Sequence, residues 1–185
     1  MSRADPRDEL IEHLPAMRAF AISLTRNGAV ADDMVQDTLV KAWTNMDSFH
    51  VGSNMRAWLF TILRNTYYSS RRKSRREVSD VDGVFAENLA EKPAHDGHLQ
   101  MADFHAALAK LKDEQREAIL LVGALGFSYE EASETTGVPV GTVKSRINRA
   151  RKQLAELMGL NEDEAMEMTD DATMSVLSAS KVSSF

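Results

Sequence analysis

The sequence predicts an all-α protein made of two small helical domains joined by a flexible linker. Every convincing periodic segment repeats its apolar residues at helical spacing, and no run alternates as a strand would. The periodicity stops between about residues 77 and 100, where Gly83, Pro93 and Gly97 accompany an acidic bias. We therefore predict a first domain over residues 1–76, a linker over 77–100, a second domain over 101–159 and an acidic, mobile tail over 160–185.

The first two expected helices meet at a proline. Leu10, Ile11 and Leu14 form a short apolar stripe that Pro15 interrupts. Proline is tolerated in the first turn of a helix but not in its interior, so a second helix should begin there and continue to about Thr25.

Two longer helices complete the first domain. The dipeptide Asn27-Gly28 indicates a turn, after which helices are expected over about residues 30–45 and 55–73. Helical spacing predicts that the following side chains face the core: Met34, Val35, Leu39, Ala42, Trp43, Trp58, Leu59, Ile62 and Leu63.

The second domain ends in a pattern typical of a helix-turn-helix. Ser128 is a plausible N-cap with Glu131 three residues later, and Gly137 can adopt the left-handed backbone that ends a helix. The next helix begins at Pro139 and carries five basic residues with no acidic one before Glu156. We expect these residues to face its core: Val140, Val143, Ile147 and Leu154. This arrangement indicates a DNA-reading helix, whereas a basic surface helix without a ligand is the structural alternative.

The charge distribution supports contact with a polyanion at two places. The net charge is −6, but residues 56–76 contain seven basic side chains and no acidic one, and residues 139–159 contain five and one. Exposed charges are screened beyond about 10 Å, so these local blocks matter more than the net charge. Two separate footprints on nucleic acid are therefore expected.

The first basic block also contains aromatic residues. Trp58 is best explained as a core residue, but Asn65, Tyr67, Tyr68 and Ser69 are expected at the exposed end of a helix, beside arginines. Aromatic rings beside cations suit unpaired bases, which stack on them.

Several other classes of function lack support in the sequence. The chain has no cysteine, no stretch long enough to span a membrane and no apolar signal region at its start, which fits a cytoplasmic protein. His95 and His98 lie in the predicted linker without further ligands at a known spacing, so no metal site is expected. No nucleophile-base-acid arrangement or phosphate-binding glycine loop is visible. We therefore predict a protein that is not an enzyme and has no cofactor.

The order of the motifs resembles that of a known family. DxxVQDTLVKAW, RAWLFTILRN with a basic run, an acidic linker and QREAILLVGALGFSYEEASETTGVPVGTVKSRINRARKQL follow one another over about residues 8–159. This order is similar to the extracytoplasmic-function, or group IV, sigma factors of bacterial RNA polymerase, whose two helical domains are called sigma-two and sigma-four. VGALGFSYEEA, GTVKSRINRAR and DVDGVFAENL resemble the EcfG-type general-stress subgroup of alphaproteobacteria.

The resemblance implies roles for particular residues. Contact with the clamp of the largest polymerase subunit is implied for Asp33, Gln36, Asp37 and Trp43. Binding of the melted minus-ten element is implied for Arg64, Asn65, Thr66, Tyr67, Tyr68, Ser69, Arg71 and Arg72. Binding of the minus-thirty-five element is implied for Lys144, Ser145, Arg146, Asn148, Arg149 and Lys152.

Two of these positions differ from some relatives. Ser69 stands where some members have a larger amide, which leaves the identity of the captured base open. Lys144 replaces an arginine, and lysine cannot make the two-bond contact of a guanidinium with guanine, so Lys144 should hold a phosphate.

The resemblance also implies partners. They are the RNA polymerase core, through the clamp and the flap of the second subunit, promoter DNA, and a NepR-like anti-sigma protein. The alternative function is a sigma-like anti-anti-sigma decoy, but such regulators normally carry a receiver domain as well. A plain transcriptional regulator would not need the first domain. The acidic tail either solubilises the chain or competes with DNA for the reading helix, and truncation after Gly159 distinguishes these two roles.

Overall fold

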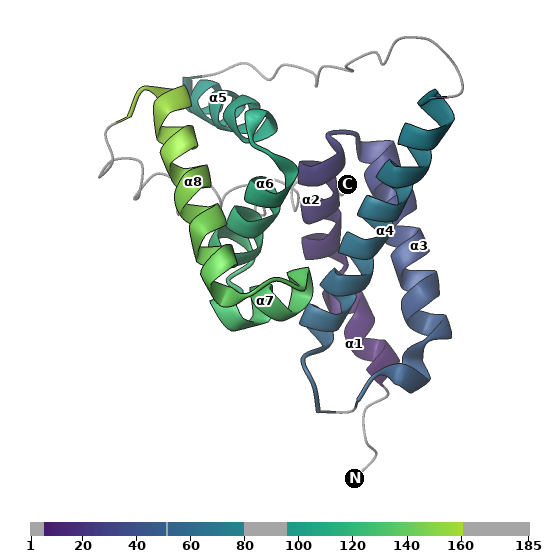
Figure 1. Cartoon of the computed structure of the whole chain (residues 1–185). Coiled ribbons are helices and arrows are strands. Elements are labelled where there is room, and N and C mark those ends of the chain that lie inside the picture. The colour runs from purple at the N-terminus through teal and green to yellow at the C-terminus, as the bar shows by residue number, and fades with distance from the viewer. Residues whose placement is uncertain (1–5, 51, 80–95, 161–185) are drawn as a thin grey trace. The chain divides into compact units, whose positions relative to one another are not determined.

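A computed structural model of the chain describes residues 6–50, 52–79 and 96–160. All regular elements in these ranges are helices (Figure 1). Contacts divide the chain into two compact units, Met1–Ala90 and Glu91–Phe185, as the expected two-domain organisation requires. The middle of the predicted linker, residues 80–95, and the predicted tail from residue 161 onward lie outside the described residues.

The first unit contains four α-helices and one short 3-10 turn. They are α1 (Pro6–Glu12), α2 (Leu14–Thr25), α3 (Gly28–Thr44), η1 (Met46–Ser48) and α4 (Met55–Ser79). Helices α2, α3 and α4 pack pairwise against one another (Figure 1). The turn before α3 is fixed locally, because the side chain of Asn27 accepts a hydrogen bond of 3.1 Å from the Val30 amide.

Aromatic rings form the centre of this unit. The rings of Phe20 on α2 and Phe60 on α4 meet edge to face with centroids 5.3 Å apart, and both side chains are buried. At the border of the same bundle, the guanidinium of Arg18 binds the carboxylate of Asp32 with a shortest distance of 2.6 Å. This bond raises the pKa of Arg18 above its ordinary value and joins α2 to α3.

The structure corrects sequence predictions for the first unit and for the bounds of the linker. Trp43 and Ile11, both expected in apolar stripes, have exposed fractions of 57% and 68%. The fourth helix does not end near Lys73 but continues to Ser79, and α5 already begins at Asp96, inside the predicted linker. The basic run has no proline or glycine, so nothing in it stops a helix. Leu10, Met34, Val35, Ala42, Leu59 and Leu63 are buried as expected, whereas Leu39, Trp58 and Ile62 are only partly covered.

The second unit is built around the last long helix. Its elements are α5 (Asp96–Lys110), α6 (Asp113–Ile119), the π-turn η2 (Leu120–Ala124), α7 (Tyr129–Thr136) and α8 (Val140–Met158). Helix α8 packs against α5, α6 and α7. One core cluster consists of Phe104, Ala107, Leu108, Leu111, Ile119, Ala150 and Leu154, with Met158 packed against it.

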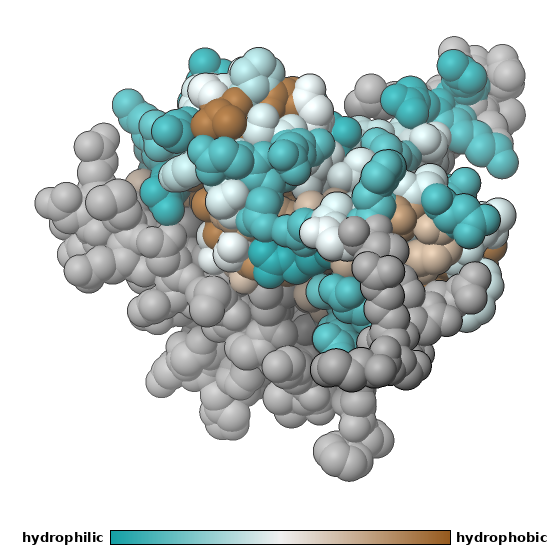
Figure 2. Space-filling view, turned by 90° about the horizontal axis from the view of Figure 1, so that it is seen from below, coloured by the Kyte–Doolittle hydropathy of each residue, from teal (hydrophilic) through white to brown (hydrophobic). Residues whose placement is uncertain are grey.

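Polar and apolar side chains both reach the surface of the described residues. On the face drawn in Figure 2, hydrophilic side chains lie beside apolar areas, one of which is extended. Within the described ranges, no helix has the length and apolar character that a membrane span requires.

Candidate nucleic-acid interface

Local hydrogen bonds determine the ends of α7 and the turn that follows it. The Ser128 hydroxyl accepts a bond of 3.0 Å from the Glu131 amide, and the Glu131 carboxylate accepts one of 2.7 Å from the Ser128 amide. These two bonds form the predicted capping box. Gly137 has φ of 70°, and the Ser133 hydroxyl donates a bond of 2.6 Å to the Val138 carbonyl. The structure thus confirms the predicted start and end of the first helix of the motif.

Helix α8 has one buried and one exposed side. Val143, Ile147 and Leu154 are buried, as predicted, whereas Val140 is half-buried and Pro139 precedes the helix instead of opening it. Spacing of three and four residues places apolar side chains on the same side of a helix, which leaves the other side for polar groups. The exposed polar residues on α8 are Lys144, Asn148, Arg149 and Lys152, followed by Glu156 near the end of the helix.

Two predicted contacts on α8 have less exposure. The half-buried Ser145 uses its hydroxyl to donate a bond of 3.0 Å to the Thr142 carbonyl. Arg146 lies two residues after Lys144, about 200° around the helix, and its Nη1 is buried without a hydrogen-bond partner among the described residues. Four of the six predicted residues are therefore exposed, and Ser145 and Arg146 are not.

The exposed stripe is linked to the first helix of the motif. The ammonium of Lys144 lies 5.2 Å from the centroid of the Tyr129 ring, at the start of α7. At this distance the positive charge is attracted by the face of the ring. The sequence analysis did not identify Tyr129.

The expected minus-ten residues lie in the middle of α4, and not at the end of a helix or in a loop. The expectation that Tyr67 faces solvent is wrong, because its side chain is buried and its hydroxyl donates a bond of 3.3 Å to the Leu24 carbonyl. Tyr68 is half-buried beneath the guanidinium of Arg64, which lies 4.7 Å from the centroid of its ring. Arg71 donates a bond of 3.1 Å to the Tyr67 hydroxyl. The two tyrosines are therefore packing residues of α4 to a greater extent than predicted.

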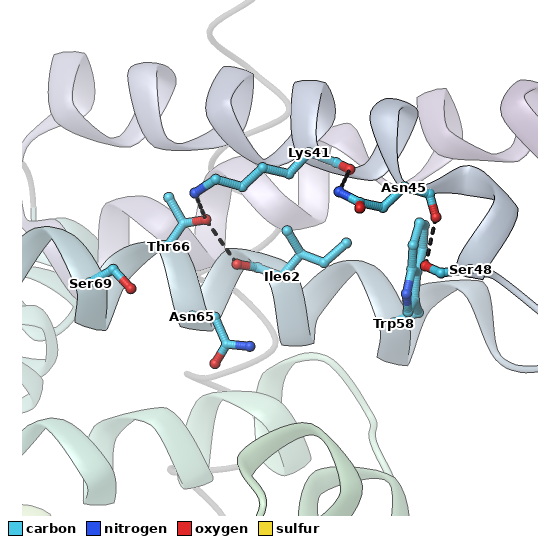
Figure 3. A pocket seen from close by; sticks show the side chains of 8 residues that line it. All are labelled: Lys41, Asn45, Ser48, Trp58, Ile62, Asn65, Thr66 and Ser69. Atoms are coloured by element: carbon cyan, nitrogen blue, oxygen red, sulfur yellow. Dashed lines mark hydrogen bonds between the residues drawn. The ribbon is translucent and has the colours of Figure 1, made fainter.

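Other predicted minus-ten residues line a pocket of about 330 Å³ between α3, η1 and α4 (Figure 3). Asn65 and Ser69 are exposed at its border, and Thr66 is buried. The structure adds residues that the sequence analysis did not assign to nucleic acid. These additional lining residues are Lys41, Asn45, Ser48, Trp58 and Ile62.

Hydrogen bonds join α3 to α4 in this pocket, as Figure 3 shows. The Lys41 ammonium donates a bond of 2.9 Å to the Thr66 hydroxyl, which itself donates one of 2.9 Å to the Ile62 carbonyl. On the other side, the Asn45 side-chain amide donates a bond of 2.7 Å to the Lys41 carbonyl, and the Ser48 hydroxyl donates one of 2.6 Å to the Asn45 carbonyl. Polar groups therefore surround an opening that also has the ring of Trp58 in its wall.

The outer side of α3 collects the four residues expected to contact polymerase. Asp33, Gln36 and Asp37 are exposed at spacings of three and four residues, and Trp43 lies further along the same side. Val40, which the sequence analysis did not select, lies between them with an exposed fraction of 65%. Acidic, amide and apolar groups thus form one surface of the helix.

Each of the two units matches a known protein family. The Sigma-70 region 2 family matches residues 10–77, and the Sigma-70 region 4 family matches residues 101–154. The ECF RNA polymerase sigma factor EcfG of Rhodopseudomonas palustris is 55% identical, and the alignment covers 82% of this chain and 84% of that protein.

Solved structures agree with these matches. The sigma factor RpoE from Bartonella quintana, in complex with the anti-sigma factor NepR, is 55% identical with a TM-score of 0.78 over 86% of this chain and 99% of its own. CnrH, in complex with the cytosolic domain of CnrY, is 31% identical with a TM-score of 0.61, over 84% of this chain and 90% of its own. Together with the helix-turn-helix and the helical first unit, these similarities show that the chain belongs to the ECF RNA polymerase sigma factors.

Proposed function

We propose that this chain directs RNA polymerase to promoters by binding two promoter elements, one with each domain. The observation that carries the proposal is the exposed side of α8, where Lys144, Asn148, Arg149 and Lys152 extend from a helix held by its buried side and by a capped partner helix. A helix with this arrangement fits the major groove of the minus-thirty-five element, where its cations meet phosphates and base edges.

The pocket between α3 and α4 supports binding of the melted minus-ten strand. An unpaired base can enter a pocket that its polar groups recognise and that an aromatic side chain borders. Asn65 and Ser69 are its exposed polar residues on α4, and the nearby arginines Arg64, Arg71 and Arg72 supply positive charge for the phosphates. We assign Tyr67 a packing role instead of a direct contact.

The outer side of α3 is the proposed contact with the polymerase clamp. Asp33, Gln36, Asp37 and Trp43 would supply acidic, amide and apolar groups to it, and Val40 joins them. The polymerase carries out the chemistry, and this chain supplies no catalysis. Linking two weak DNA-binding domains raises the effective concentration of each for the other.

The likeness to EcfG and to the NepR-bound RpoE supports a place in the general stress response, with a NepR-like anti-sigma protein as inhibitor. We place the action of the protein in the cytoplasm, where polymerase and promoters are. The alternative, a sigma-like decoy for an anti-sigma protein, has less support because a decoy needs neither an exposed basic side on α8 nor a base-sized pocket.

Reconstitution with purified polymerase core tests this function. Wild-type protein should form a holoenzyme, protect two separated stretches of promoter DNA from cleavage and start transcripts at one position. Arg149→Ala should weaken the upstream protection, and Asn65→Ala should reduce strand opening. Lys110→Ala, which removes an exposed cation from α5, is the control and should change neither. A protein that binds an anti-sigma protein but starts no transcripts with the core would be the decoy.

The clamp contact is tested by affinity for the core without DNA. Trp43→Ala should lower this affinity, because it removes the large exposed apolar group of the proposed surface. Ile11→Ala, at an exposed apolar residue of α1, is the matched control. Equal affinities of the two variants would contradict the assignment of this side of α3.

A further inference from the structure

Lys41 and Thr66 are 25 residues apart in the sequence and are hydrogen-bonded in the pocket. Their hydrogen bonds indicate that Lys41, and not Thr66, is available to a ligand. A hydroxyl has one hydrogen to donate. Thr66 donates that hydrogen to the Ile62 carbonyl of its own helix and accepts a bond from Lys41. With a 6% exposed side chain, Thr66 has little surface to offer to DNA, although the sequence predicted that it binds the melted strand.

Lys41, in contrast, reaches the same pocket with donors in excess. An ammonium has three N–H groups and no acceptor. One of them binds Thr66, and the other two have no partner among the described residues. No acidic side chain is among the eight residues that line the pocket. A ligand in the pocket therefore meets a positive charge that its walls do not neutralise.

We propose that Lys41 is a DNA-binding residue that donates a hydrogen bond to a keto oxygen of the unpaired base in the pocket, and that Thr66 is its positioning residue. This inference rests on the proposed capture of a minus-ten base. An ammonium can only donate; the exocyclic keto oxygen of thymine, guanine and cytosine accepts such a bond, whereas the exocyclic group of adenine is an amino donor, which leaves adenine only its ring nitrogens as acceptors. Lys41 therefore makes the pocket favour a keto base over adenine.

The position of the ammonium favours the base over the backbone as its ligand. Its nitrogen is held at Thr66, a buried residue of α4, and so lies against the wall of the pocket (Figure 3). When a nucleotide is extruded, its base enters the pocket while the phosphodiester remains at the entrance. The contact of the Lys41 ammonium within the pocket therefore depends on which base is present.

Binding of holoenzyme to single-stranded oligonucleotides of the non-template minus-ten element tests this proposal. At each position the oligonucleotide carries one of the four bases or an abasic site. Lys41→Met keeps the length of the side chain and removes its charge. It should weaken binding about tenfold at one position when that position holds a keto base, and have little effect there with adenine or an abasic site.

Two variants of Thr66 test the positioning role. Thr66→Val keeps the shape and removes the hydroxyl, so it should reduce the same preference to a smaller extent. Thr66→Ser keeps the hydroxyl, so its preference for a keto base should equal that of wild type. In the double variant, Thr66→Val should add nothing to Lys41→Met, because the bond that it removes is already absent.

The possible failures are distinguishable. If Lys41→Met also weakens binding to an oligonucleotide with an abasic site at that position, Lys41 binds a phosphate, and the proposal is overturned. A loss of core affinity with unchanged base preference shows a role in the clamp contact or in folding, and also overturns it. If wild-type holoenzyme binds every abasic oligonucleotide as tightly as the intact one, and Asn65→Ala changes nothing, then the pocket captures no base and the proposed function of the pocket fails.

Discussion

The ammonium of Lys144 lies over the ring of Tyr129, 5.2 Å from its centroid. This contact joins the exposed side of α8 to the first residue of α7, so it restrains a cation of the proposed DNA-binding side before DNA binds. A side chain that is already held loses less conformational entropy when it binds. We therefore expect the ring to contribute to DNA affinity through Lys144, although the two residues are 15 positions apart.

Replacing the ring tests this contribution. Tyr129→Phe keeps the aromatic face and should preserve minus-thirty-five binding, whereas Tyr129→Leu should weaken it by about 0.5–1 kcal/mol. The measurement is the equilibrium affinity of holoenzyme for promoter duplexes at low salt. In the Lys144→Gln background, the two Tyr129 variants should bind equally well, and a persistent difference between them would refute the coupling.

Arg149 and Lys144 should differ in the kind of contact that they make. If Arg149 reads a base edge, then Arg149→Ala costs about 1–3 kcal/mol and relaxes preference at one promoter position. If Lys144 holds a phosphate, Lys144→Ala should weaken binding to all promoters about equally and flatten the salt dependence. A panel of single-base promoter variants measured at several salt concentrations checks both. Identical profiles of the two variants would contradict the assignment.

Tyr67 should affect stability more than DNA binding. Its buried ring packs in the first domain, so Tyr67→Ala should lower the free energy of unfolding by about 3–5 kcal/mol. Tyr67→Phe removes the hydroxyl that donates to the Leu24 carbonyl and accepts from Arg71, and it should cost about 1 kcal/mol. Urea denaturation of the whole chain gives these values. Binding of the melted strand by the Tyr67→Phe variant should equal that of wild type, and a selective loss of strand binding would restore a direct role for the hydroxyl.

The capping box of α7 should stabilise the second domain. Ser128→Ala removes the acceptor for the Glu131 amide and should cost about 0.5–2 kcal/mol. Thermal unfolding measures this loss, and Ser128→Asp, which retains an acceptor, should recover most of it. Ser53→Ala is a control in an exposed turn of the first domain. If Ser53→Ala lowers stability as much as Ser128→Ala does, the cap has no special role.

Local sequence signals were sufficient wherever neighbouring residues determine the conformation. Ser128 and Glu131 lie three positions apart, and Gly137 adopts the positive φ that glycine tolerates best, so the start and end of α7 follow from a few adjacent residues. The buried side of α8 also follows from nearby residues, because apolar residues at helical spacing lie on one side of the helix, and that side packs against the core. The order of the motifs identified the family without knowledge of any tertiary contact.

Tertiary structure decided which side chains of the first domain are covered. An aromatic side chain suits both a core and an exposed binding surface, so periodicity could not reveal that Tyr67 is buried against α2 or that Trp43 remains exposed. The pocket is also a product of packing: Lys41 and Thr66 meet only because α3 lies beside α4. The sequence by itself therefore determined the helices, the two domains and the family. Contacts between helices distant in the sequence decided the pocket between α3 and α4 and its exposed cation, because burial depends on which surfaces meet.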